Sequence, residues 1–149
     1  GGAGARWREV GLMRVGHGSN MRFRQDYPGL MIEIHIKGIS VLARTEEHVD
    51  VKVMGGEIWH DFVLYCLEQH YFGLENLSLI PGTVGAAPVQ NIGAYGVEIK
   101  DRLLELEALE ISSGKFRTFT NAECEFAYRS SVFKQALQGQ FIICSVSFR

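Results

Sequence analysis

Cysteine, proline and long apolar runs are all scarce in this sequence. Three prolines and three cysteines occur among 149 residues, and the cysteines, Cys66, Cys124 and Cys144, lie far apart. No C-x-x-C pair is present, which argues against a disulfide framework and against a zinc knuckle. We therefore expect buried, reduced thiols and a cytoplasmic protein.

An excess of charge of one sign is also missing. The chain carries 15 basic and 17 acidic residues, a net charge of −2, so we expect no nucleic-acid partner. Its apolar runs are far shorter than a membrane span, and its first ten residues lack the apolar core of a signal peptide. The five histidines form no H-x-x-x-H pair, so we expect no metal site.

Glycine, in contrast, is abundant. Of its 17 copies, six lie in residues 1–18 and four in residues 82–96 of a chain that is 46% hydrophobic and 21% charged. The overall composition is that of a soluble globular protein. Clustered glycine indicates backbone at positive φ, or backbone that approaches another group closely.

Hydrophobic periodicity predicts strands at both ends of the chain and one helix between them. Residues 58–70 follow a helical stripe, and residues 74–100 form a long glycine-rich loop, which in a compact domain is usually functional. We expect residues 1–9 to be a loop and residues 121–123 to begin a short helix. The expected strands are residues 11–15, 30–36, 40–44, 49–54, 104–111, 117–120 and 141–148. This order predicts an α+β fold with a mainly antiparallel sheet and a boundary near residues 44–48.

Two glycine-containing segments are candidates for binding a ligand. Residues 16–20, G-H-G-S-N, follow a predicted strand, and successive N–H groups in such a turn can hold phosphate oxygens, although an ordinary turn explains the pattern equally well. Residues 81–96, P-G-T-V-G-A-A-P-V-Q-N-I-G-A-Y-G, have no amphipathic stripe. A flat ligand can lie against such a backbone, and the alternative is a structural loop packed on the sheet.

The third candidate is A-Y-R-S-S-V-F-K, residues 127–134. Arg129 stands here between an aromatic residue and two hydroxyl residues. Arginine suits bidentate contact with carboxylate or phosphate, whereas the simpler interpretation is a solvated or salt-bridged side chain.

Together these segments resemble one flavoenzyme family. The family is that of the UDP-N-acetylenolpyruvoylglucosamine reductases of the first type. Three segments of this chain resemble its motifs in order and spacing: G-H-G-S-N, residues 73–101 and residues 121–134. The resemblance implies an FAD-binding fold of the vanillyl-alcohol oxidase (PCMH) type, truncated, with residues 1–44 as a partial first subdomain and residues 45–149 as the second. It further implies that these residues contact FAD: Gly16, His17, Gly18, Ser19, Asn20, Met21, Pro81, Gly82, Thr83, Gly85, Ala86, Ala87, Gln90, Asn91, Gly93, Ala94, Tyr95 and Gly96.

The same resemblance implies a reaction. NADPH reduces FAD, and hydride then passes to the enolpyruvyl group of a UDP-sugar in peptidoglycan synthesis, which serves cell shape and division. Arg129 matches the catalytic arginine that also binds substrate, and Tyr128 supports the substrate pocket beside it. Ala86 and Ala87 stand where some family members carry serine. A monomer with a small-molecule substrate is the expected state.

The sequence also departs from this family. The G-S-F-F-type motif that carries the family's proton-donating serine does not occur in the 149 residues, so we expect the substrate domain to be absent and the isolated chain to be inactive. A non-catalytic flavin-binding fragment therefore stays open as the alternative. A phosphotransferase with a P-loop is disfavoured because the G-K-[ST] element is missing.

Overall fold

The structure is a computed structural model that describes the backbone of residues 6–11, 20–26 and 29–149 and the side chains from His35 onward. Strands β1 (Arg6–Gly11), β2 (Asn20–Asp26) and β3 (Gly29–Ile34) form an antiparallel sheet in that order. For residues 6–9 this corrects the predicted loop, whereas residues 1–5 lie outside the described residues. The prediction also missed β2, whose Met21 and Phe23 alternate with polar residues, because glycine and proline stand close to it in the sequence.

A second, larger sheet has five antiparallel strands. They are β4 (Ile39–Arg44), β5 (Val49–Met54), β8 (Leu103–Glu110), β9 (Phe116–Thr120) and β10 (Phe141–Phe148). The spatial order is β4-β5-β10-β8-β9, so the last strand of the chain lies in the middle. Because β10 is covered on both faces and paired on both edges, all but its first residue are buried.

Helix α1 (Trp59–Glu68) supplies the aromatic core on one face of this sheet. Trp59 is fully buried, and its ring centroid lies 5.8 Å from those of both Phe62 and Phe148. Its indole Nε1–H donates to the carbonyl oxygen of Leu77 at 2.8 Å. This bond anchors the long loop to the helix.

The segment predicted as a long loop contains only short elements. These are the 3₁₀ turns Glu75–Leu77 and Ile99–Asp101 and the two-residue strands β6 (Gly93–Ala94) and β7 (Val97–Glu98). A further 3₁₀ turn, Ala122–Cys124, follows β9 as expected. The α+β, mainly antiparallel fold class is confirmed.

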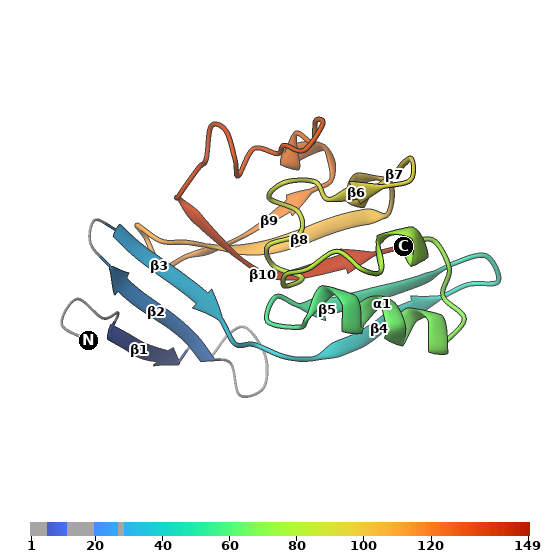
Figure 1. Ribbon diagram of the computed structural model, residues 1–149, viewed down its shortest axis with the longest axis horizontal. Coiled ribbons are helices and arrows are strands. Elements are labelled where there is room, and N and C mark those ends of the chain that lie inside the picture. Colours follow the sequence, from blue (N-terminus) through green and yellow to red (C-terminus); the bar gives the residue numbers. More distant parts are fainter. Residues whose placement is uncertain (1–5, 12–19, 27–28) are drawn as a thin grey trace.

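The change from one sheet to the other occurs earlier than predicted. β4 pairs with β5, with Val41 opposite Val51, so a boundary at residue 44 cuts through a hairpin. The sheets change between Ile34 and Ile39, as Figure 1 shows where the chain leaves β3. The polar stretch at residues 45–48 is therefore a hairpin turn rather than a linker.

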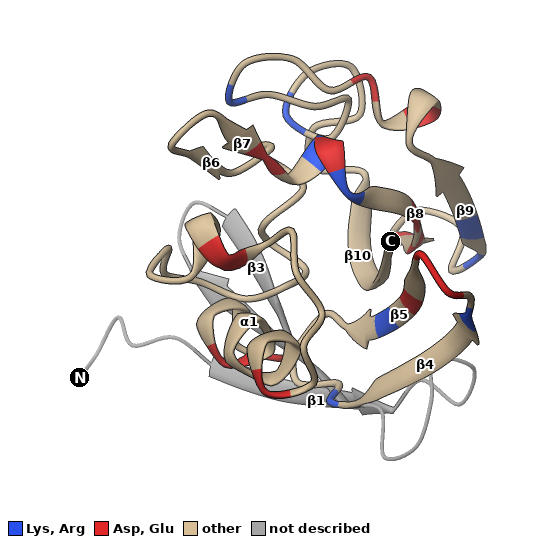
Figure 2. Ribbon diagram, turned by 90° about the vertical axis from the view of Figure 1, so that its right-hand side faces the viewer, with Lys and Arg blue, Asp and Glu red and all other residues tan. Residues whose placement is uncertain are grey.

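Charge is dispersed over the described part of the chain. In the view of Figure 2, acidic and basic segments are scattered over strands, turns and loops. Among the described residues, no helix has the length and apolar character needed to cross a membrane.

Candidate functional site: a glycine-rich cavity beside an arginine turn

A cavity in the described part of the chain lies where the glycine-rich loop meets the start of β10. Its volume is about 680 Å³, within the range typical of ligand pockets. Four of the residues predicted to contact the cofactor line it: Thr83, Gly85, Ala86 and Gln90. The remaining lining residues are Val89, Ile111, Phe133, Lys134, Gln138, Gly139, Phe141, Ile142 and Ile143.

Backbone hydrogen bonds fix this loop against the turn between β5 and α1. The N–H of Val84 donates to the carbonyl of Glu57, and the N–H of Gly85 donates to that of Gly55, both at 2.9 Å. A Cβ atom at Gly85 would lie 2.9 Å from the carbonyl oxygen of Ile143 and 3.2 Å from that of Gly55. Glycine is therefore required here because two other backbone segments approach it.

The other predicted cofactor residues of this loop differ in accessibility. Ala87 is buried in the main core, so its side chain does not reach the cavity. Pro81, Gly82 and Gly96 are exposed. Tyr95 is 88% exposed and has a positive φ of 52°, so its ring projects into solvent.

Arg129 lies at the tip of a tight turn next to this loop. The N–H of Ala127 donates to the carbonyl of Ser130 at 3.0 Å, and the reverse bond is 3.1 Å. Arg129 takes a positive φ of 49° within the turn. Its Nη2 donates to the carbonyl of Gly93 at 2.8 Å, and its Nη1 lies 3.8 Å from Oε2 of Glu98.

The neighbouring Tyr128 is 82% exposed. The guanidinium carbon of Arg129 lies 4.9 Å from the centroid of its ring, within range for a cation–π contact. Because 38% of the Arg129 side chain is also exposed, an anionic ligand can reach both residues.

Two side chains connect the arginine turn to the cavity. The Ser131 hydroxyl donates to the carbonyl of Val89 at 2.8 Å, and Nζ of Lys134 donates to the carbonyl of Arg129 at 3.2 Å. Val89 and Lys134 both line the cavity. The second and third sequence candidates are thus parts of one continuous site.

The first sequence candidate cannot be placed in the same way. Residues 16–19 of G-H-G-S-N lie outside the described residues, and Asn20 and Met21 are described only as backbone at the start of β2.

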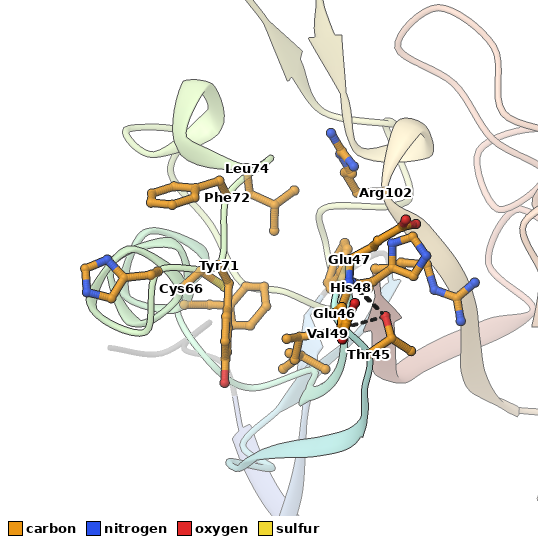
Figure 3. Close-up of a pocket in the computed structure, with 15 residues that line it drawn as sticks. Thr45, Glu46, Glu47, His48, Val49, Cys66, Tyr71, Phe72, Leu74 and Arg102 are labelled. Atoms are coloured by element: carbon orange, nitrogen blue, oxygen red, sulfur yellow. Dashed lines mark hydrogen bonds between the residues drawn. The ribbon is translucent and has the colours of Figure 1, made fainter.

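A second cavity, of about 320 Å³, was not foreseen from the sequence. Figure 3 shows the turn from Thr45 to His48 on one side and Tyr71, Phe72 and Leu74 on the other. Its lining comes from segments that are distant in sequence, so no local motif could have revealed it. Arg149, which also lines it, donates two 2.8 Å hydrogen bonds to Asp50, and these bonds lower the pKa of that carboxyl.

The three cysteines are core residues, and Cys66 also lines the second cavity. Cys66, Cys124 and Cys144 are free and buried, as predicted. Burial raises the pKa of each thiol to about 12. They are protonated core residues at neutral pH.

Comparison with known proteins places the chain in a family. Residues 3–120 match the model of a family described as FAD binding domain, which covers most of the chain, and the chain therefore belongs to that family.

The similarity extends to one kind of enzyme. The chain is 52% identical over 137 residues to the UDP-N-acetylenolpyruvoylglucosamine reductase of Amoebophilus asiaticus and 49% identical over 144 residues to that of Chromobacterium violaceum. These matches cover 92% and 96% of the chain but only 40% and 42% of the relatives, so the chain spans about two fifths of their length. The crystal structure of the Thermus caldophilus reductase (MurB) is similar with a TM-score of 0.58 and 28% identity, covering 66% of this chain and 35% of that one. The resemblance inferred from the motifs is confirmed.

Proposed function

We propose that this chain forms the flavin-binding part of an NADPH-dependent reductase that converts UDP-N-acetylglucosamine enolpyruvate to UDP-N-acetylmuramate. The observation that carries the proposal is the continuity between the cavity of the glycine-rich loop and the Arg129 turn. Ser131 and Lys134 hold these two parts together through backbone carbonyls.

The residues present fit FAD. At the cavity wall Gly85 has no side chain and Ala86 has only a methyl group, which leaves room for a flat ring system. Gln90 is exposed there and has an amide that can both donate and accept hydrogen bonds. The wall formed by Phe133, Phe141 and Ile143 is apolar, as expected of a cofactor pocket.

When bound, FAD supplies hydride transfer between the nicotinamide and the substrate. Arg129 then binds the carboxylate of the enolpyruvyl group and stabilises the negative charge that develops as the double bond is reduced. The carbonyl of Gly93 orients the guanidinium, and Tyr128 packs against its face. We extend the proposal to NADPH as the reductant, a monomeric state and a cytoplasmic location.

A chimera tests this reaction. Residues of this chain replace the matching segment of the Chromobacterium violaceum reductase, with which they share 49% identity over 144 residues. We expect the purified chimera to reduce its bound flavin once with NADPH but to oxidise NADPH over many turnovers only when the enolpyruvyl substrate is present, and the 149-residue chain alone not to turn over.

A second candidate function is that of a flavin-binding module without catalysis. The match of residues 3–120 to the model of a family described as FAD binding domain supports flavin binding whatever the reaction. A chimera that binds flavin but does not oxidise NADPH in response to substrate would support this second function over the first.

A further inference from the structure

Asn91 is the most completely enclosed polar side chain of the site. It is 0% exposed, and its backbone has a positive φ of 43°. Its Nδ2 donates to Oε2 of Glu98 at 3.0 Å and to the carbonyl of Ala127 at 2.9 Å. Its Oδ1 accepts a hydrogen bond from the N–H of Lys100 at 3.1 Å.

These bonds join Asn91 to the base of the arginine turn. The carbonyl of Ala127 also accepts the hydrogen bond from Ser130 that closes the turn around Arg129. Ala127, the base of the turn that carries Arg129, lies 36 residues after Asn91 in the sequence. The Asn91 amide therefore fixes the position of that base.

Asn91 also fixes both groups that hold the guanidinium. The carbonyl of Gly93 accepts a hydrogen bond from Arg129, and Gly93 lies opposite Glu98 in the antiparallel pair of β6 and β7. Glu98 in turn keeps its carboxylate oriented by accepting from Asn91. A Cβ atom at Gly93 would lie 2.6 Å from Nη1 of Arg129 and 2.9 Å from the carbonyl oxygen of Val97, so a side chain there would displace the guanidinium and press on the backbone of Val97.

We propose that Asn91 is a positioning residue for Arg129 and not a direct ligand of the cofactor. Its complete burial leaves no atom of its side chain accessible to a bound molecule, and both its donor hydrogens and its acceptor are used within the protein. The carboxylate-binding role assigned to Arg129 rests on the proposed function; its fixed orientation rests on the contacts around Asn91.

Substitution Asn91→Asp tests this with little change in shape. It replaces the amide donor by an oxygen that faces two acceptors, Glu98 and the Ala127 carbonyl. The matched control is Asn121→Asp, because Nδ2 of Asn121 likewise donates to two groups, the carbonyls of Lys100 and Leu103, without touching the arginine turn.

The probe is pyruvate, and the readout is the Nε–Hε NMR signal of Arg129, assigned by its loss in Arg129→Lys. We expect a single sharp signal in the unaltered chain and in Asn121→Asp, and a broadened or multiple signal in Asn91→Asp. Since misplacing a binding group by about 1 Å can cost ~100-fold, we expect pyruvate affinity to fall 10- to 100-fold in Asn91→Asp and to change little in the control. An unchanged signal and affinity in folded Asn91→Asp would overturn the proposal.

Glu98→Gln provides a second test if Asn91→Asp does not fold. It removes the anion 3.8 Å from Nη1 but leaves an oxygen that can accept from Asn91. We expect the Arg129 signal to stay sharp and pyruvate to bind more tightly, since a competing carboxylate is gone. A loss of order in Glu98→Gln would show that the charge of Glu98, rather than Asn91, orients Arg129.

The two proposals can fail separately. If the unaltered chain shows an ordered Arg129 signal but no pyruvate binding, the carboxylate-binding role fails while the positioning role of Asn91 stands. FAD binding by Asn91→Asp is expected to equal that of the unaltered chain. A loss of FAD in folded Asn91→Asp would contradict the assignment of Asn91 as a residue that acts only through Arg129.

Discussion

At the scale of single residues, Arg129 combines a constrained backbone with an accessible charge. Its turn is closed by two hydrogen bonds, and the guanidinium is held by Gly93 while 38% of the side chain stays exposed. Such a preorganised donor does not need to reorganise when negative charge develops on a ligand. This is the property that the proposed reduction requires.

The first residue-scale prediction concerns Arg129→Lys in the chimera. Lysine keeps the charge but cannot donate in the planar, bidentate geometry of the guanidinium, so we expect substrate-dependent NADPH oxidation to fall roughly 10²–10³-fold. The control is Arg117→Lys, since Arg117 also lies over an aromatic ring, that of Phe119, but away from the site. Equal rates for the two variants would contradict the role of Arg129.

A second residue-scale prediction concerns the buried thiols. Burial raises the pKa of Cys66, Cys124 and Cys144 from 9.0 to about 12. Above pH 9 the unfolded chain loses these protons and the folded chain keeps them, so the stability of the fold decreases as pH rises toward 12. Denaturant unfolding across this range measures the decrease, which we expect to be smaller in a variant combining Cys66→Ala, Cys124→Ala and Cys144→Ala.

At the scale of elements, the glycine-rich loop depends on close backbone packing. In Gly85→Ala the new Cβ would lie 2.9 Å from the Ile143 carbonyl oxygen, so the loop or β10 has to shift. We expect a loss of about 1–3 kcal/mol in the free energy of unfolding, as for other overpacked sites, together with weaker FAD binding. The exposed neighbour provides the control: Ala86→Ser should change stability by less than about 0.5 kcal/mol.

The bond between helix α1 and the long loop gives a further prediction. Trp59→Phe removes the 2.8 Å indole donor and leaves the Leu77 carbonyl oxygen with only the longer hydrogen bond from the N–H of Ile80, at 3.3 Å. The expected loss is about 1–3 kcal/mol in the free energy of unfolding, measured by chemical denaturation. A matched aromatic change at an exposed position, Phe72→Leu, should have little effect, since Phe72 is 68% exposed.

Local periodicity predicted the elements whose environment is simple. β5 and β10 carry apolar residues that pack on the core, and α1 presents Trp59, Phe62 and Cys66 on one buried stripe. β1 and β2 were missed because they are short and charged and because glycine is frequent in the sequence between them. The pairing of β4 with β5 was missed because a polar hairpin turn and an interdomain linker have similar composition.

The site was predictable only to the extent that motifs mark it. The glycine-rich loop and Arg129 could be selected from the sequence, and the structure brings them together. The role proposed for Asn91 and Glu98 could not be selected from the sequence, because their hydrogen bonds join residues up to 36 positions apart. The second cavity, shown in Figure 3, depends in the same way on segments that meet only after folding.

At the scale of the whole molecule, two antiparallel sheets follow each other along the chain, and the glycine-rich loop packs against the larger one. The loop and β10 form the walls of the cavity, while the turn after β9 presents Arg129 beside it. Each part of the proposed site is thus fixed by a different region of the larger sheet. The central claim is that this arrangement holds FAD.

The most direct test is the visible absorption spectrum of the purified chain after incubation with FAD and desalting. We expect flavin bands that elute with the protein and that are weaker in Gly85→Ala, whose backbone packing is disturbed. We also expect NADPH to bleach these bands in the chimera. Flavin that separates completely from the folded chain would contradict the claim that these residues hold the cofactor.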